Sequence, residues 1–156
     1  MLYSQIESTV YTWAFSNSPI PVIFANENGV RPNSKYITLN IISYTPIGQP
    51  YHHMTNINGD RNIDQNEDFT VELNAFYPGS HDDLQVLKNS LKKDAVIQSI
   101  NDNGLVIRDS NGNVIDISTL VDNTIEKRYL YEFRMSHTET ISENVSFIET
   151  VDIEQV

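Results

Sequence analysis

The histidines are the residues of this chain whose type could support chemistry most directly, and two of the four, His52 and His53, are adjacent. Neighbouring residues of a strand point to opposite faces, so the pair is poorly placed to bind one metal ion. His81 falls in the first turn of a predicted helix and His137 near the end of a predicted strand, and neither has a catalytic motif beside it. The pattern therefore predicts a surface loop for His52-His53 and no histidine-based metal site.

A second candidate is a run of oxygen-bearing side chains at alternate positions, a spacing that calcium loops use. The run comprises Asn56, Asn58, Asp60, Asn62 and Asp64. An EF-hand loop needs glycine at its sixth position and glutamate at its twelfth. The sixth residue is instead Arg61 when counted from Asn56, and Ile63 when counted from Asn58. We therefore interpret the run as a polar β-hairpin and predict no metal and no other cofactor.

Carboxylates are frequent, but their positions favour structural roles over acid–base catalysis, which needs a pair of titratable groups held in a cleft. Asp82 and Asp83 fit the start of a helix, where negative charge is favourable. Glu72, Glu132 and Glu149 fit the solvent face of strands. The sequence has no nucleophile elbow, phosphate-binding glycine loop or zinc motif. We predict that the protein is not an enzyme.

Composition narrows the class of protein further. The 156 residues suffice for one domain with its own core, so we predict a single domain over 1–156. A net charge of −11 argues against affinity for DNA phosphates, which needs clustered lysine and arginine. The chain has no cysteine, no apparent signal peptide and no apolar run long enough to span a membrane. We expect synthesis in a cytoplasm and no membrane contact.

Apolar periodicity predicts the elements that must carry these residues. The first half is predicted to contain a helix over 2–16, strands over 21–24, 36–43 and 69–77, and a projecting β-hairpin over about 44–66. Asn58-Gly59 lies at the centre of this hairpin and favours a type I′ turn. We expect Trp13 to anchor the first helix to a sheet.

The second half is predicted to begin with helices over 80–91 and 95–101, the first opened by a capping-box-like Ser80 and Asp83. Two small strands, 105–109 and 114–117, are predicted to pair around Asn111-Gly112, followed by strands over 127–138 and 146–151. The aromatic residues Tyr129, Tyr131 and Phe133 are predicted to face the core. The order of elements predicts an α+β fold, a mixed and mainly antiparallel sheet covered by helices on one face.

Several short motifs then occur in a characteristic order along the chain. They are Tyr11 and Trp13, the turn Ala25-Asn26-x-Asn28-x-x-Arg31-Pro32, Tyr36-x-x-Leu39, a hairpin after Ile47-Gly48, the strand Phe69-x-Val71-x-Leu73-x-Ala75-x-Tyr77 ending in Pro78-Gly79, the helix with Leu84, Leu87 and Leu91, the strand from Glu126-Lys127-Arg128 to Phe133, and Ile148-Glu149-x-Val151. With these motifs in this order, the chain resembles the bacteriophage neck/tail-terminator family along most of its length.

The resemblance implies a virion structural protein without enzymatic activity. Such proteins form a sixfold homo-oligomeric ring at the head-proximal end of the tail tube, between the tail-tube protein and the head–tail connector or adaptor proteins. The ring stops tube growth, and genomic DNA passes through its lumen without sequence-specific binding. An acidic inner wall would repel the passing DNA.

The resemblance also suggests where an oligomer interface lies. We expect the hairpin tip, with Asn58, Gly59, Asp60 and Arg61, to contact a neighbouring subunit or an adjoining ring. Arg31 is expected either to pair with a carboxylate of a neighbour or to have a purely local role. Three alternatives stay open: a tail-tube or baseplate component that polymerises further, a calcium- or glycan-binding accessory domain, and an unrecognised hydrolase.

Overall fold

The computed structural model describes residues 3–146. The elements in chain order are α1 (Tyr3–Asn17), β1 (Val22–Phe24), β2 (Tyr36–His52), β3 (Asp60–Phe76), α2 (Ser80–Ser90), α3 (Asp94–Asp102), β4 (Val106–Asp109), β5 (Ile115–Asp116), β6 (Thr119–Val121), β7 (Thr124–Glu126) and β8 (Arg128–Asn144). The strand predicted over 146–151 lies outside the described residues from position 147 onward.

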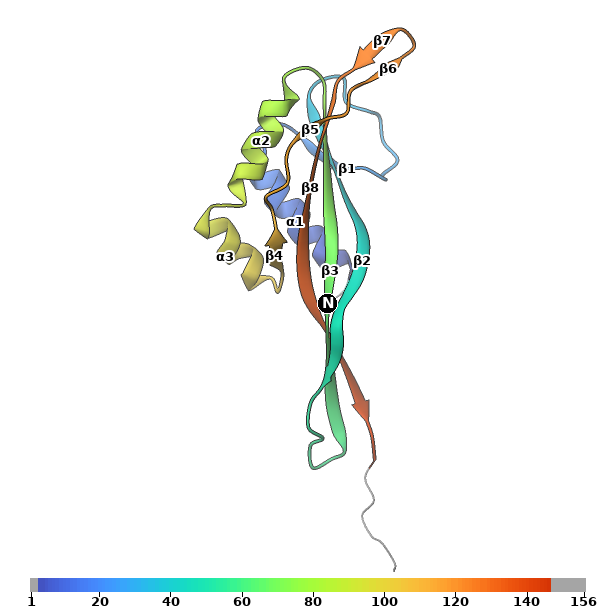
Figure 1. Ribbon diagram of the computed structural model, residues 1–156, viewed down its shortest axis with the longest axis vertical. Helices are drawn as coiled ribbons and strands as arrows, with labels where there is room; N and C mark the ends of the chain where they lie inside the picture. Colours follow the sequence, from blue (N-terminus) through green and yellow to red (C-terminus); the bar gives the residue numbers. More distant parts are fainter. Residues whose placement is uncertain (1–2, 147–156) are drawn as a thin grey trace, which may run out of the picture.

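Most of the strands form one mixed, mainly antiparallel sheet. Its order is β1-β2-β3-β8-β4, with β5 also paired to β8. Only β1 runs parallel to its neighbour. Figure 1 shows the three helices gathered beside one end of the sheet, while β2, β3 and β8 continue well past them. The α+β fold predicted from the sequence, with its projecting hairpin, is confirmed.

The core lies between the helices and one face of the sheet. Alternate residues of β3 are buried, and they pair in register with buried residues of β8, as in the pairs Val71–Phe133 and Leu73–Tyr131. The period-2 alternation makes this face apolar and the opposite face polar. The helices contribute Ile6, Val10, Leu84, Leu87 and Ile100 to the same cluster.

Trp13 anchors α1 to the rest of the domain, as the sequence predicted. Its side chain is only 6% exposed, and its indole Nε1 donates a hydrogen bond of 3.0 Å to the Ser90 hydroxyl at the end of α2. The ring meets Phe133 edge-on, with 5.3 Å between centroids. A single side chain thus joins both helices to the central strand β8.

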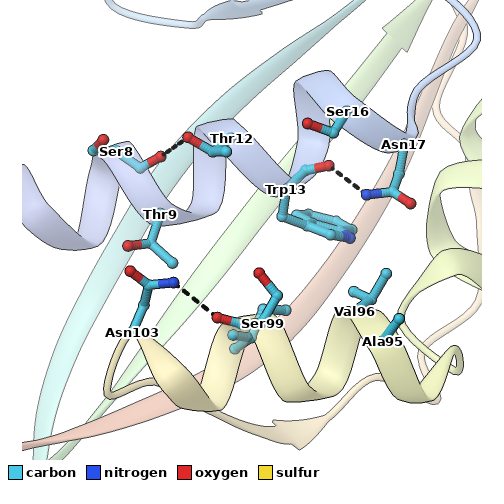
Figure 2. Close-up of a pocket in the computed structure, with 11 residues that line it drawn as sticks. Ser8, Thr9, Thr12, Trp13, Ser16, Asn17, Ala95, Val96, Ser99 and Asn103 are labelled. Carbon is cyan, nitrogen blue, oxygen red and sulfur yellow. Dashed lines mark hydrogen bonds between the residues drawn. The ribbon is translucent and has the colours of Figure 1, made fainter.

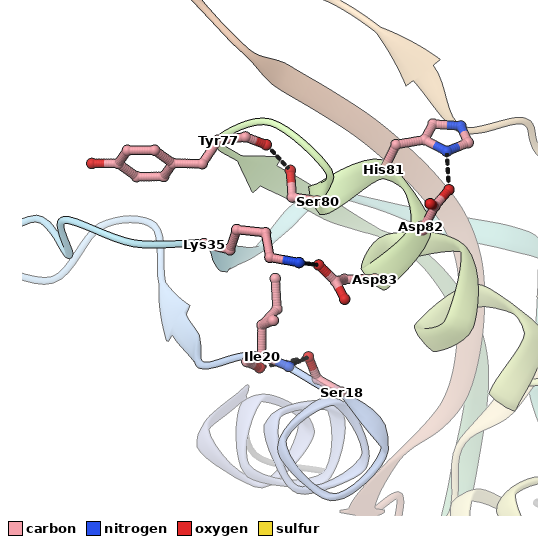
Figure 3. Close-up of polar contacts among 8 residues, drawn as sticks. All are labelled: Ser18, Ile20, Lys35, Tyr77, Ser80, His81, Asp82 and Asp83. Carbon is pink, nitrogen blue, oxygen red and sulfur yellow. Dashed lines mark hydrogen bonds and ion pairs between the residues drawn. The ribbon is translucent and has the colours of Figure 1, made fainter.

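The start of α2 differs from the predicted capping box. Gly79 is the N-cap residue, with a left-handed φ of 82°, and no side chain caps the helix. Ser80 is already helical, and its hydroxyl donates back to the Tyr77 carbonyl at 2.7 Å (Figure 3). Asp83 forms an ion pair of 2.6 Å with Lys35, which fixes α2 to the chain entering β2 (Figure 3). The Asp83 carboxylate, which in a capping box would accept a hydrogen bond from the backbone at the start of the helix, is therefore paired with Lys35 instead.

The two small strands after α3 were predicted to pair with each other, but in the structure they do not. β4 and β5 both pair antiparallel with β8, at Ile107–Met135 and Ile115–Leu130, so they form one interrupted edge strand. Gly112 lies between them, where the chain passes close to β8. A Cβ at this position would lie 2.9 Å from the Glu132 carbonyl oxygen. Close approach to the backbone, and not a hairpin turn, explains this glycine.

Candidate functional site

The projecting hairpin predicted over about 44–66 is present, and β8 adds a third strand to it. β2 and β3 are 17 residues each, and β8 pairs with β3 without a register shift from Asp60–Asn144 to Phe76–Arg128. We call residues 44–66 together with 138–146 the arm. Polar alternation hid the extension of β8 beyond its predicted end at residue 138, because a ribbon with no helix over it lacks the apolar stripe that marks a half-buried strand.

A ladder of side-chain hydrogen bonds joins β3 and β8 along one face of the arm. Thr138 donates to Asn66 at 2.8 Å, Thr140 to Asp64 at 2.7 Å and Ser142 to Asn62 at 2.8 Å. Each donor lies directly opposite its acceptor in the strand register. Asn62 and Asp64, two of the five residues that resembled a calcium loop, are therefore part of this ladder. Among residues 3–146, no three His, Asp or Glu side chains group at metal-binding distance.

The turn at the arm tip is not the predicted type I′ turn, which needs a positive φ at both central residues. Gly59 has a φ of 82°, but Asn58 is not left-handed. The Asn56 side-chain oxygen accepts hydrogen bonds of 2.9 Å from the backbone N–H groups of both Asn58 and Asp60. This Asx-type capping starts the turn at Asn56, whereas the Asn-Gly pair predicted a turn that starts two residues later.

The predicted interface residues at the tip are bound to the end of β8. The Gly59 carbonyl accepts a hydrogen bond of 2.9 Å from the backbone N–H of Val145. Arg61 Nε donates to Glu143 at 2.6 Å, and Asp60 accepts from Asn144 at 2.8 Å. The four residues thus share one tip, and their role at an interface remains a prediction.

Arg31 lies at the other end of the molecule and has a partner within its own chain. Its guanidinium donates to both carboxylate oxygens of Glu126, at 2.5 and 3.4 Å. It also lies over the Phe76 ring at 5.1 Å, while Arg128 covers the same ring at 5.5 Å. The hydrogen bond from Arg31 holds the pKa of the Glu126 carboxyl below its ordinary value. The local role considered for Arg31 is therefore present in this structure.

Beside this ion pair lies a two-stranded hairpin that sequence analysis missed, β6–β7. Its turn residues Asp122 and Asn123 have φ values of 46° and 63°, the two positive angles of a type I′ turn. Leu120 and Ile125 are opposite each other and more than 60% exposed. A groove of about 380 Å³ runs between the hairpin and Tyr77. The pair Asp-Asn was the one signal that could have revealed this turn.

A groove of about 330 Å³ lies between α1 and α3 (Figure 2), and its lining residues do not form a catalytic site. Its lining is mostly hydroxyl and amide side chains that donate to their own helix. Thr12 donates to the Ser8 carbonyl at 2.7 Å and Asn103 to the Ser99 carbonyl at 2.8 Å. None of the lining residues is an acid, a base or a histidine.

His137, predicted near the end of a strand, lies in β8 and is the one histidine that the structure places in the interior. Its side chain is 3% exposed and packs against the rings of Tyr44 and Phe69. Its Nε2 lies 3.4 Å from a Glu67 oxygen, without the geometry of a hydrogen bond. The bulge at Ser43 keeps Tyr44 on the helix-side face of the sheet, where it covers this histidine. His52 and His53 are exposed as predicted.

Comparison with known families identifies the class of protein. The family model for the phage neck terminator protein matches residues 4–156. The chain belongs to this family. No curated protein matches this neck terminator. Family membership makes it a protein of the phage neck in the virion, associated with other tail and connector proteins, and it agrees with a structural role. Within residues 3–146 of this neck terminator, no helix has the length and apolar character needed to span a membrane.

Proposed function

We propose that this neck terminator forms a closed ring of six copies that caps the tail tube and joins it to the head–tail connector, with genomic DNA passing through the bore. The observation that carries the proposal is the family match across residues 4–156. A ring needs a heterologous interface, in which two different surfaces of the same chain meet. The elongated molecule offers two such surfaces at opposite ends, the arm and the β6–β7 hairpin (Figure 1).

Charge supports the passage of DNA without capture. The chain carries 21 acidic and 10 basic residues. In the described part, five basic residues are engaged by carboxylates, as in Arg31–Glu126, Lys35–Asp83 and Arg61–Glu143. Binding to DNA would instead require basic side chains free to neutralise phosphates. A ring of these subunits would therefore repel the DNA backbone more than it attracts it.

The experiment is native mass spectrometry together with negative-stain microscopy of the purified protein, concentrated and with magnesium. We expect discrete sixfold rings with a bore wide enough for a duplex, roughly 20 Å. Long tubes would instead indicate a tail-tube component. A ligand-dependent rise in thermal stability without assembly would favour an accessory binding domain.

A variant that replaces residues 50–62 by Asn-Gly tests the arm as an interface. The apolar core lies outside the arm, so the variant should remain folded, with a cooperative thermal transition. We expect it to remain a monomer under conditions in which the parent protein forms rings. Rings of unchanged stoichiometry would show that the arm is not needed between subunits. A point variant at the tip, Arg61→Ala, provides a milder test of the same contact.

A further inference from the structure

Asparagine followed by glycine occurs four times in this chain. The pairs are Asn28-Gly29, Asn58-Gly59, Asn103-Gly104 and Asn111-Gly112. Asparagine is a labile residue, and it loses its side-chain amide most readily before glycine, because glycine has no Cβ to hinder its own backbone nitrogen. That nitrogen attacks the asparagine side chain readily only when it is accessible and free of a hydrogen bond. The fold therefore decides which of the four pairs is reactive.

Two of the pairs are protected by a hydrogen bond from the glycine nitrogen. At the arm tip, the Gly59 N–H donates to the Asn56 carbonyl at 3.1 Å. After α3, the Gly104 N–H donates to the Asn101 carbonyl at 2.9 Å. The Asn103 side chain is engaged as well, because it donates to a carbonyl of its own helix. Each of these glycine nitrogens must break a hydrogen bond before it can react.

The pair between β4 and β5 is held by its contact with β8. Gly112 lies so close to β8 that a Cβ would be 2.9 Å from the Glu132 carbonyl oxygen. The residue before Asn111 is fixed from the same strand, since the Tyr131 hydroxyl donates to the Ser110 carbonyl at 2.8 Å. Ring closure between an asparagine side chain and the next nitrogen requires the backbone to turn. At this pair, such a turn would move the chain against or away from β8.

Asn28-Gly29 has none of these restraints. Both residues are exposed, and they lie outside helices and strands in the loop between β1 and β2. Within residues 3–146, no hydrogen bond engages the Asn28 side chain or the Gly29 N–H. A Cβ on Gly29 would meet nothing within 4 Å, so the space beside this backbone is open. The nitrogen and the side chain it would attack are therefore both accessible.

The fold also gives no backbone reason for a glycine at position 29. Gly59 and Gly104 have positive φ angles of 82° and 77°, and Gly112 is too close to β8 to carry a side chain. Gly29 has neither a positive φ nor a close neighbour. A larger residue would fit there without strain. Gly29 can therefore be replaced to test its chemistry without disturbing the fold.

We propose that Asn28 is a modification site, at which the folded chain deamidates spontaneously and ahead of the other three Asn-Gly pairs. Hydroxide takes the proton of the Gly29 N–H, and the nitrogen attacks the side-chain carbonyl carbon of Asn28. The new C–N bond closes a succinimide ring, and the former amide nitrogen takes a proton from water, which restores the hydroxide, and leaves as ammonia. Water then opens the ring at either carbonyl and leaves aspartate or isoaspartate at position 28. The reaction consumes only water.

The modification changes the charge of a surface that Arg31 shares. Asn28, Arg31 and Tyr36 line one groove of about 280 Å³. Deamidation adds a carboxylate to this groove and makes the net charge of −11 one unit more negative. Isoaspartate also adds a methylene to the backbone of the loop that carries Arg31, the residue that donates to Glu126. The inference concerns a single chain and does not depend on ring formation.

Peptide mapping by mass spectrometry tests the proposal on the full-length protein, incubated at mildly alkaline pH. We expect deamidation at Asn28 to be at least about fivefold faster than at Asn58 or Asn103, whose glycine nitrogens are hydrogen-bonded. It should also be faster than at Asn111. In concentrated urea, the four rates should become similar. Equal rates in the folded protein, or an Asn28 rate that stays ahead by the same factor in urea, would overturn the proposal.

Gly29→Ala tests the ring closure itself. The added methyl group hinders the attacking nitrogen but has open space, so the variant should keep the thermal transition of the parent protein and deamidate several-fold more slowly at Asn28. Val30→Ala is the matched control, because Val30 is 97% exposed and does not carry the attacking nitrogen. This control should deamidate as the parent does. An unchanged rate in Gly29→Ala would overturn the proposal.

The product provides an independent test of the same step. Opening of a succinimide gives isoaspartate together with aspartate, and labelling with an isoaspartyl methyltransferase detects the first of these at position 28. Aspartate alone would show direct hydrolysis of the Asn28 side chain and would overturn the attack by the Gly29 nitrogen.

Discussion

Arg31 and Glu126 are 95 positions apart in the sequence, yet the guanidinium of one donates to both carboxylate oxygens of the other. Their contact joins the polar turn after β1 to the last residue of β7. Phe76 lies beneath the guanidinium, so the pair is held by ring stacking as well as by charge. This arrangement fixes the β6–β7 hairpin relative to the sheet.

A double-mutant cycle of Arg31→Ala and Glu126→Gln should show a coupling of about 0.5–1 kcal/mol in urea unfolding, as for other partly exposed ion pairs. The pKa of Glu126 is lowered in the folded state, mainly by its hydrogen bond from Arg31. The stabilisation is therefore fully present above the pKa of an unfolded glutamate, and is lost as the pH falls through the lowered folded value. A coupling that vanished already at pH 7 would contradict the contact.

Trp13→Phe should lower the free energy of unfolding by about 1–3 kcal/mol, because it removes the hydrogen bond to Ser90 and part of a buried ring. Phe15→Ala on the same helix is the matched control, since Phe15 is 64% exposed. The control should change stability by no more than about 0.5 kcal/mol. Chemical denaturation measures both variants, and equal effects would exclude the anchoring role of Trp13.

Gly112→Ala should destabilise the protein by about 1–3 kcal/mol, because the new Cβ would press against the Glu132 carbonyl of β8. Gly29→Ala provides the control, since a Cβ there meets nothing within 4 Å. Thermal unfolding of the two variants should separate them clearly. A neutral Gly112→Ala would mean that the chain can withdraw from β8 at no cost.

His53→Ala should raise the pKa of Asp64 toward its ordinary value, because the largest cause of its lowered pKa is the hydrogen bond with His53. Thr140→Val should raise it as well, since the Thr140 hydroxyl is the second donor to this carboxylate. NMR titration of the Asp64 carboxyl carbon measures both shifts. His52→Ala is the control, and a pKa change of equal size there would argue against the specific contact.

The prediction of the body of the domain succeeded because its signals are local. Apolar residues alternate from Phe69 to Ala75, and helical spacing places Leu84 and Leu87 on one face, so both buried surfaces could be identified from the sequence. Ser80 shows the limit of such signals. It has the right spacing for a capping box, but Asp83 is engaged by Lys35 from another element.

The arm and its surroundings depended on contacts between distant parts of the chain. Thr140 pairs with Asp64 across 76 positions, and nothing near either residue marks them as strand partners. The β4–β5 edge strand likewise exists because β8 offers it a partner, so its pairing was mispredicted. Local patterns predicted a polar hairpin over about 44–66 and two small strands over 105–109 and 114–117, but they did not predict that these segments pair with β8 or join a sheet that includes it.

The sequence by itself determined the α+β class, the buried faces of the helices and central strands, and membership in the neck terminator family, because each depends on the order and periodicity of nearby residues. Only the tertiary structure decided how far β8 extends along the arm, which residue pairs with Arg31 and which strand β4 and β5 pair with. Those features arise from long-range contacts, such as the pairing of β8 with β3 over their full length. Such pairing depends on the complementarity of two segments far apart in the chain, which no local pattern records.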